Sequence, residues 1–224
     1  MFIPVEHLLL RLRQPASRAA EIAALRQRLR AERAAAVSDD ERALADDVGR
    51  AKRAVAAAVG EVTACGTCAV GRPWPVGSSA GGACCAGTTA IVFDDHELAA
   101  LAGAGTRPRD LRPPAGADAH AGCAFRGAHA CSLALDHRPA RCIHFACNTL
   151  RGELHRGGRL DDVETQLAAL DRAMRAFTAE HRARQDRDVL GPVLDAVRAA
   201  AQTARHGAQA AMPTKSSSLS APVK

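Results

Sequence analysis

The chain has 224 residues, of which 47% are hydrophobic but only 3% aromatic, and its net charge is +6. No segment approaches the roughly 20 apolar residues of a membrane-spanning helix, and residues 1–10 lack the basic start of a secretory signal, so we expect a cytoplasmic protein that makes no membrane contact. The positive charge does not indicate nucleic-acid binding, because in residues 1–64 eleven Lys and Arg are interspersed with nine Asp and Glu, as on a solvated, ion-paired helix surface.

Residues 1–62 predict an N-terminal helical hairpin. Apolar residues recur at helical spacing between Ala16 and Val37. A second helix is expected from Ser38, whose hydroxyl can cap the free amides, while Glu41 completes a capping box. The apolar stripe of this helix consists of Leu44, Val48, Ala51, Val55, Val59 and Val62. We expect antiparallel packing of the two helices and a role as scaffold, or as the surface that binds a protein partner or a second copy.

Residues 63–158 predict a loop-rich module with little β structure. Their many glycines and prolines are typical of turns. The β-branched and aromatic residues at 88–93 favour one short strand. Asp94 is expected to cap a short helix after it, and the proline-containing residues 103–121 to form a loop.

Residues 159–212 are expected to be helical again. A helix should start at Asp161 or Asp162, and a second one should follow Pro192. The apolar residues of the first helix are spaced by four and three positions, which is typical of a core-facing helix. They are Val163, Leu167, Leu170, Met174 and Phe177. Residues 213–224 lack an apolar pattern and predict a disordered tail. The fold class is therefore mainly α, with helices flanking the central module.

All the cysteines of the chain lie in this central module. They are Cys65, Cys68, Cys84, Cys85, Cys123, Cys131, Cys142 and Cys147. In a cytoplasmic protein, clustered thiols indicate metal or redox chemistry more often than disulfides. Thiolates bind zinc tetrahedrally or hold iron–sulfur clusters, with four ligands per centre, so eight cysteines could complete two centres, or one with four left over. Disulfides remain the alternative.

The spacing of the cysteines leaves the metal open. Cys65 and Cys68 form a CxxC knuckle, but zinc ribbons repeat this knuckle and the chain has only one. The looser spacings further along suit an iron–sulfur site at least as well. Cys84 and Cys85 are adjacent and would point to opposite faces of an extended segment, which predicts different roles for them. We favour an iron–sulfur cluster slightly over zinc.

The second half of the cysteine series resembles a known family. It contains Gly122-Cys123-Ala124-Phe125, then Cys131, then Arg138-Pro139-Ala140-Arg141-Cys142, then Phe145-Ala146-Cys147. This order resembles the YkgJ-type, or CxxCxxCC, zinc- or iron-chelating proteins over about residues 63–150. The resemblance implies that the six cysteines from Cys84 onward are metal ligands or close neighbours of the metal.

The chain departs from the family pattern at two places. Fifteen residues separate Cys68 from Cys84 where the family has two, and Ile143 follows Cys142 where the family has arginine. The flagellin lysine methylase has a similar cysteine pattern, and its cluster is associated with methyl transfer to protein lysines. The radical-SAM triplet CxxxCxxC is absent from this chain, so methyl transfer comes only by analogy.

Residues between the cysteines have structural alternatives to a role at the metal. Pro139 is expected to fix the turn into Cys142, and Arg138 to donate to a loop carbonyl or to a cluster sulfur. Three histidines could replace a thiolate ligand: His129, His137 and His144. Cys84 could instead be a reactive nucleophile, but the His and Asp partners that this role needs cannot be identified in the sequence.

Two functional hypotheses follow. The first is a metal-binding protein with a cysteine-ligated iron–sulfur cluster or zinc, acting as a redox or methyl-transfer accessory. The second is a zinc-stabilised interaction module without catalytic activity, in which the helical hairpin binds the partner. No catalytic residue or substrate can be named from the sequence.

Overall fold

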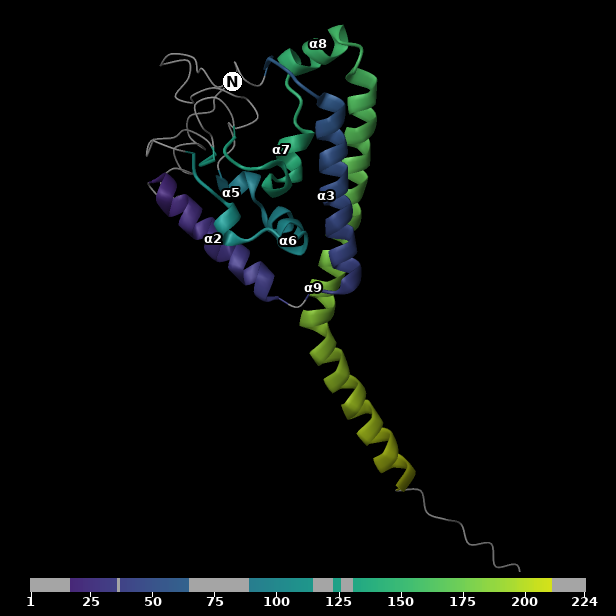
Figure 1. The fold of residues 1–224 in the computed structure, drawn as a ribbon. Coiled ribbons are helices and arrows are strands. Elements are labelled where there is room, and N and C mark those ends of the chain that lie inside the picture. Colours follow the sequence, from purple (N-terminus) through teal and green to yellow (C-terminus); the bar gives the residue numbers. More distant parts are fainter. Residues whose placement is uncertain (1–16, 36, 65–88, 115–122, 126–130, 211–224) are drawn as a thin grey trace, which may run out of the picture. The chain divides into compact units, whose positions relative to one another are not determined.

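The computed structural model describes residues 17–35, 37–64, 89–114, 123–125 and 131–210 (Figure 1). Within these residues it contains α2 (Arg18–Ala34), α3 (Asp39–Val59), α5 (Thr89–Val92), α6 (Asp95–Gly103), α7 (Ala140–His144), α8 (Asn148–Arg156) and α9 (Leu160–Ala210), with 3₁₀ helices η3 (Pro108–Asp110) and η4 (Leu135–His137). The described residues form no β-strand. The prediction of a mainly α fold is confirmed.

The chain divides into two compact units, Met1–His181 and Arg182–Lys224. Helix α9 runs through both units, so its two parts are described separately. The predicted tail at 213–224 lies outside the described residues. None of the helices in the described part of the chain combines the length and apolar character that crossing a membrane requires.

The two predicted N-terminal helices are present. Ser38 caps α3, because its Oγ accepts the Glu41 backbone N–H at 3.1 Å, and Ser17 caps α2 in the same way. Both helices contact α6, which lies between them in Figure 1. Each helix supplies residues to a different core cluster, so the two helices do not pack mainly against each other, as the predicted antiparallel hairpin required, but support the central module from two sides.

The first core cluster joins α2 to the central module. Its buried residues include Ile22, Leu25 and Leu29 from α2, Phe93, Leu98 and Leu101 from around α6, and Leu111, Cys123, Ala124, Phe125 and Leu133. The rings of Phe93 and Phe125 lie 5.4 Å apart, a distance typical of a favourable aromatic pair. A cysteine segment is thus part of the core itself.

The second core cluster joins α3 to α8 and the first part of α9. It includes Val48 and Val55, Ala64, Ala140, Leu150 and Leu154, and Val163, Leu167, Leu170 and Phe177. The apolar stripes predicted for α3 and for the helix after Asp161 are therefore confirmed as core. Gly103 permits the close approach of α6 to α3, since a Cβ at this position would lie 2.8 Å from the Cβ of Ala45.

The strand predicted at 88–93 is wrong, because Thr89–Val92 forms the short helix α5. In a strand, side chains alternate between two faces, so Thr89, Ile91 and Phe93 would share one face. In the structure Thr89, Val92 and Phe93 are buried while Ile91 is 45% exposed, as helical spacing requires. Burial against the first core cluster overrides the β propensity of these residues.

The prediction of a separate helix after Pro192 is also wrong, because α9 continues through this residue. Proline lacks the N–H that would bond to the Asp188 carbonyl, which weakens α9 locally without ending it. The apolar residues around Pro192 in the second unit are more than half exposed: Val189, Leu190, Val193, Leu194 and Val197.

Candidate metal centre

The structure describes four of the eight predicted cysteine ligands, namely Cys123, Cys131, Cys142 and Cys147. The other four, Cys65, Cys68, Cys84 and Cys85, lie outside the described residues, as does His129.

Cys123, Cys131 and Cys142 gather at the first core cluster. Cys123 is a buried member of it, and Cys131 and Cys142 are half-buried and pack against it. The Ser132 backbone N–H donates to the Phe125 carbonyl at 2.9 Å, so the segment that ends at Phe125 and the segment that starts at Cys131 lie side by side. Cys123 and Cys131 therefore lie on neighbouring segments of the chain.

A buried threonine fixes the Cys123 segment to the helices. The Thr89 hydroxyl, at the start of α5, accepts the Ala124 N–H at 2.8 Å and donates to the Glu21 carboxylate of α2 at 2.5 Å. Both hydrogen-bonding capacities of this hydroxyl are used inside the protein. The residue after Cys123 is thus tied to α5 and, through α5, to α2.

The segment before Cys142 is held by two buried ionisable side chains. Lys52 on α3 is 2% exposed, and its Nζ donates to the carbonyl oxygens of Asp136 and Arg138 at 2.7 and 2.9 Å. Glu97 on α6 is 5% exposed, and its carboxylate accepts the N–H groups of Ala140 and Arg141 at 2.7 and 2.8 Å. Cys142 follows directly, as the third residue of α7.

Burial dominates the electrostatics of this pair. It lowers the pKa of the Lys52 ammonium from 10.5 to about 8, although the negative charges of Glu97 and Asp136 oppose that decrease. Burial also raises the pKa of the Glu97 carboxyl above its ordinary value of 4.5, while the two N–H groups that donate to it oppose the rise. A negative charge on Cys142 would also raise the Lys52 pKa, by less than the other groups.

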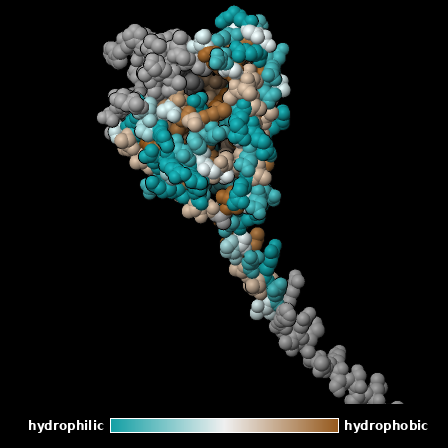
Figure 2. Space-filling model, in the orientation of Figure 1, coloured by the Kyte–Doolittle hydropathy of each residue, from teal (hydrophilic) through white to brown (hydrophobic). Residues whose placement is uncertain are grey.

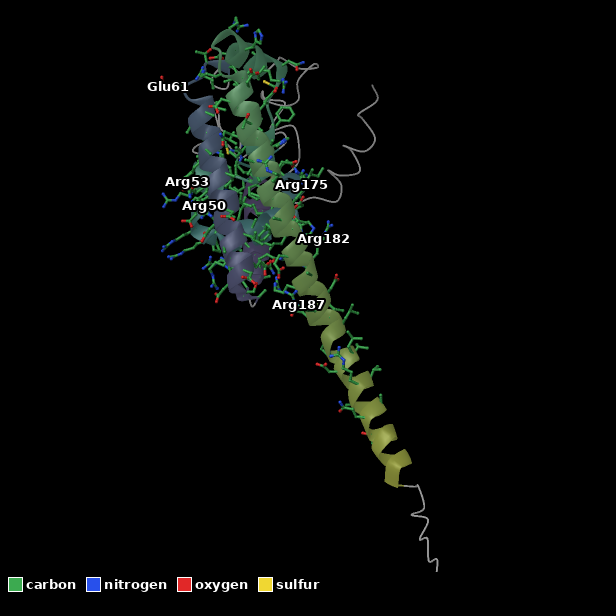
Figure 3. All side chains as sticks on the ribbon, turned by 90° about the vertical axis from the view of Figure 1, so that its right-hand side faces the viewer. Arg50, Arg53, Glu61, Arg175, Arg182 and Arg187 are labelled. Atoms are coloured by element: carbon green, nitrogen blue, oxygen red, sulfur yellow. The ribbon has the colours of Figure 1, made fainter. Side chains whose placement is uncertain are left out.

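Lys52 is buried, unlike its basic neighbours Arg50 and Arg53 on α3, which are labelled in Figure 3. Arg50 and Arg53 point outward from the helix, where they pair with Asp47 and Asp136. Lys52 lies instead on the apolar side of α3, between Val48 and Val55, both buried. Its position within the predicted apolar stripe was the signal that could have revealed it as a buried lysine.

Cys147 is placed by a different set of contacts. It is the N-cap of α8, and its Sγ accepts the Leu150 backbone N–H at 3.4 Å. It packs against the second core cluster rather than the first. Its sulfur therefore has a structural role in α8 that the sequence analysis did not anticipate.

Residues 63 and 64, directly before Cys65, are anchored to the same helix. The Glu153 carboxylate of α8 accepts the backbone N–H groups of Thr63 and Ala64, both at 2.8 Å. Ala64 is buried in the second core cluster, against which Cys147 also packs. Ala64, which directly precedes Cys65 in the sequence, therefore belongs to the core cluster against which Cys147 packs.

The other residues of the cysteine motifs serve the fold. The Arg138 side chain donates to the Leu133 carbonyl at 2.9 Å, which confirms the expected structural role, and Pro139 is the N-cap residue of α7. The His137 ring pairs with the Thr106 hydroxyl at 3.1 Å, and His144 is exposed. On the face drawn in Figure 2, hydrophobic residues gather over α7, and Phe145, next to this helix, is 45% exposed.

The described residues do not complete a metal site by themselves. Among them, no group of three or more His, Cys, Asp or Glu side chains lies close enough to hold a metal ion. A thiolate-ligated centre needs four ligands, so the described cysteines as they are arranged do not form one by themselves. The donor chemistry of the thiols suits zinc and iron–sulfur clusters.

No protein-family model matches the chain, and neither the curated proteins nor the solved structures contain a significant match.

Proposed function

We propose that the chain is a cytoplasmic metal-binding protein whose cysteines hold an iron–sulfur cluster or, as the second candidate, zinc. The observation that carries this proposal is that Thr89, which follows Cys84 and Cys85 in the sequence, binds the residue next to Cys123, and that Ala64, which precedes Cys65, lies in the core cluster against which Cys147 packs. A group of cysteines recruited from distant parts of a sequence is what a thiolate metal site requires.

Two anchors support the proposal. Thr89 lies four residues after Cys85 and accepts the N–H of Ala124, next to Cys123. Ala64 precedes Cys65 and is buried in the cluster against which Cys147 packs. The described residues that flank these cysteines in the sequence are thus fixed beside Cys123 and in the core cluster of Cys147.

The resemblance to the YkgJ-type family is part of the same proposal. It concerns Cys84 through Cys147 and implies a ligand set drawn from these residues. A redox or methyl-transfer accessory role follows from the iron–sulfur form, whereas a zinc-stabilised interaction module follows from the zinc form. The apolar faces of α2 and α3 are used in the chain's own core, so a partner of these helices would have to bind their outer, polar faces.

The metal itself distinguishes the two forms. We would purify the full chain with and without oxygen and measure iron, acid-labile sulfide and zinc per chain together with the visible absorption spectrum. Iron and sulfide in equal amounts with a brown colour would establish a cluster. A colourless protein with stoichiometric zinc would eliminate the cluster, and a protein without bound metal, whose denatured form has few free thiols, would favour disulfides.

The ligand assignment is tested by replacing Cys142 or Cys147 with serine. Each variant is expected to lose metal, because a serine hydroxyl is a poor ligand for zinc and for iron–sulfur clusters. Full metal content in both variants would overturn the assignment of these cysteines.

A further inference from the structure

Two helices that carry none of the described cysteines control the backbone that leads into Cys142. Lys52 of α3 binds the carbonyls of Asp136 and Arg138, and Glu97 of α6 binds the N–H groups of Ala140 and Arg141. Four hydrogen bonds from two buried side chains thus bind four of the six consecutive residues 136–141. Cys142 is the next residue along the chain.

Helix α7 depends on these bonds for its position. It has only five residues and no side-chain cap from its own N-cap residue, Pro139. A helix of this length is not stable by itself, since nucleation is costly and the first N–H groups have no intrahelical partner. Glu97 supplies the missing acceptors from another helix, and Lys52 fixes the turn that precedes them.

Filling space does not explain the choice of a lysine and a glutamate. Burying charged groups costs free energy, and apolar side chains of similar volume are often neutral or stabilising in their place. Apolar side chains could fill the same volume, but they could not bind backbone carbonyls and N–H groups at fixed points. The pair therefore makes a contribution to backbone position that apolar packing lacks.

We propose that Lys52 and Glu97 are positioning residues for Cys142, which hold its thiol in the orientation that metal binding requires. This inference rests on the proposed metal-binding function. Outer residues that orient metal ligands typically change metal affinity by about 10- to 100-fold when they are replaced, and we expect this range here.

The test compares Lys52→Met and Glu97→Gln with two matched controls. Arg53→Met removes an exposed neighbour that also contacts Asp136, through its carboxylate at 2.8 Å. Asp95→Asn alters an exposed acid on the same helix as Glu97. Glu97→Gln retains the size of the side chain and one acceptor oxygen, so it remains informative if Lys52→Met does not fold.

The first readout is release of zinc, added to the reduced protein, to a chromogenic chelator. We expect release to be at least about tenfold faster in both buried-site variants and unchanged in both controls. The second readout uses metal-free protein, in which the rate of Cys142 alkylation by iodoacetamide is measured by peptide mass spectrometry with Cys147 as internal reference. We expect the Cys142 rate to change severalfold while the Cys147 rate stays constant.

The two readouts separate the inference from the proposed function. If the wild-type protein binds no metal, the proposed function fails, and the alkylation rates still decide whether Lys52 and Glu97 position Cys142. Equal rates at Cys142 in variants and wild type would overturn the inference. So would a parallel rise at Cys142 and Cys147, because it would indicate general loosening of the fold.

Discussion

Glu41 on α3 and His181 on α9 form a buried pair in which carboxylate Oε1 and ring Nδ1 lie 2.5 Å apart. Both side chains are at most 2% exposed. The His181 ring also stacks on Phe177 at 5.7 Å. The pair joins the first turn of α3 to the last residue of the first unit.

We expect Glu41→Ala to lower the free energy of unfolding by about 3 kcal/mol, because removal of one partner leaves the other polar group buried. Urea denaturation measures the loss. Asp39→Ala is the control, since Asp39 lies in the same turn of α3 and pairs with Arg42 on the surface; it should change stability little. Equal losses in the two variants would contradict a role for the buried pair.

The double variant Glu41→Leu, His181→Phe should lose less stability than the sum of its two single variants, because it removes both polar groups together. A full double-mutant cycle by urea denaturation measures this coupling. Additive losses would show that the two side chains act independently.

The capping sequences of α3 and α6 show which contacts can be predicted from neighbouring residues alone. Ser38 and Asp94 cap their helices as predicted, since these bonds depend on residues three positions apart. The glutamates of the same sequences contact distant partners: Glu41 contacts His181, and Glu97 contacts Ala140 and Arg141. The starts of these two helices could therefore be predicted from the sequence, whereas α5 could not, and the connections between the helices depended on the folded arrangement.

The stability contributed by Lys52 should depend on pH. Burial lowers its pKa in the folded state from 10.5 to about 8, so between these values the unfolded chain binds the proton that the folded protein has lost. The free energy of unfolding should then rise with pH in this window, by at most about 1.4 kcal/mol per pH unit.

The comparison of wild type with Lys52→Met isolates this effect. Urea denaturation of metal-free, reduced protein at about pH 7.5 and about pH 10 should show that the stability difference shifts in favour of the wild type as pH rises. A difference that does not change with pH would mean that burial leaves the Lys52 pKa at its ordinary value.

Pro192 should weaken α9 locally in the second unit. Proline within a helix costs about 3 kcal/mol relative to alanine, so Pro192→Ala is expected to slow amide hydrogen exchange at residues 186–196, followed by mass spectrometry. Ala196→Gly is the control of opposite sign and should accelerate exchange. Unchanged exchange rates in Pro192→Ala would indicate that the proline does not weaken the helix.

The cysteines of the candidate site could be predicted only in part from the sequence. A site shared by Cys123 and Cys131 could be anticipated from the confinement of the thiols to one module and stays a prediction, because the structure describes only their packing at the first core cluster. The use of the Cys147 sulfur as a helix cap could not, since cysteine is not a preferred N-cap residue. Cys147 therefore has two possible reasons to be a cysteine, one in α8 and one at a metal.

Substitutions at Cys147 can separate these two roles. Serine preserves the cap, because its Oγ can accept the Leu150 N–H that Sγ accepts at 3.4 Å. Alanine removes both the cap and the thiolate. We expect Cys147→Ala to lose about 1 kcal/mol of stability in the metal-free protein and Cys147→Ser to lose less, as measured by urea denaturation.

The metal content of Cys147→Ser and Cys147→Ala then tests whether Cys147 is a ligand. If Cys147 is a ligand, both variants should lose metal to the same extent despite their different stabilities, because neither has a thiolate. If the sulfur acts only as a cap, Cys147→Ser should keep the metal content and stability of the wild type. Cys142→Ala is the reference for ligand loss without cap loss, since Cys142 lies within α7 rather than at its N-cap.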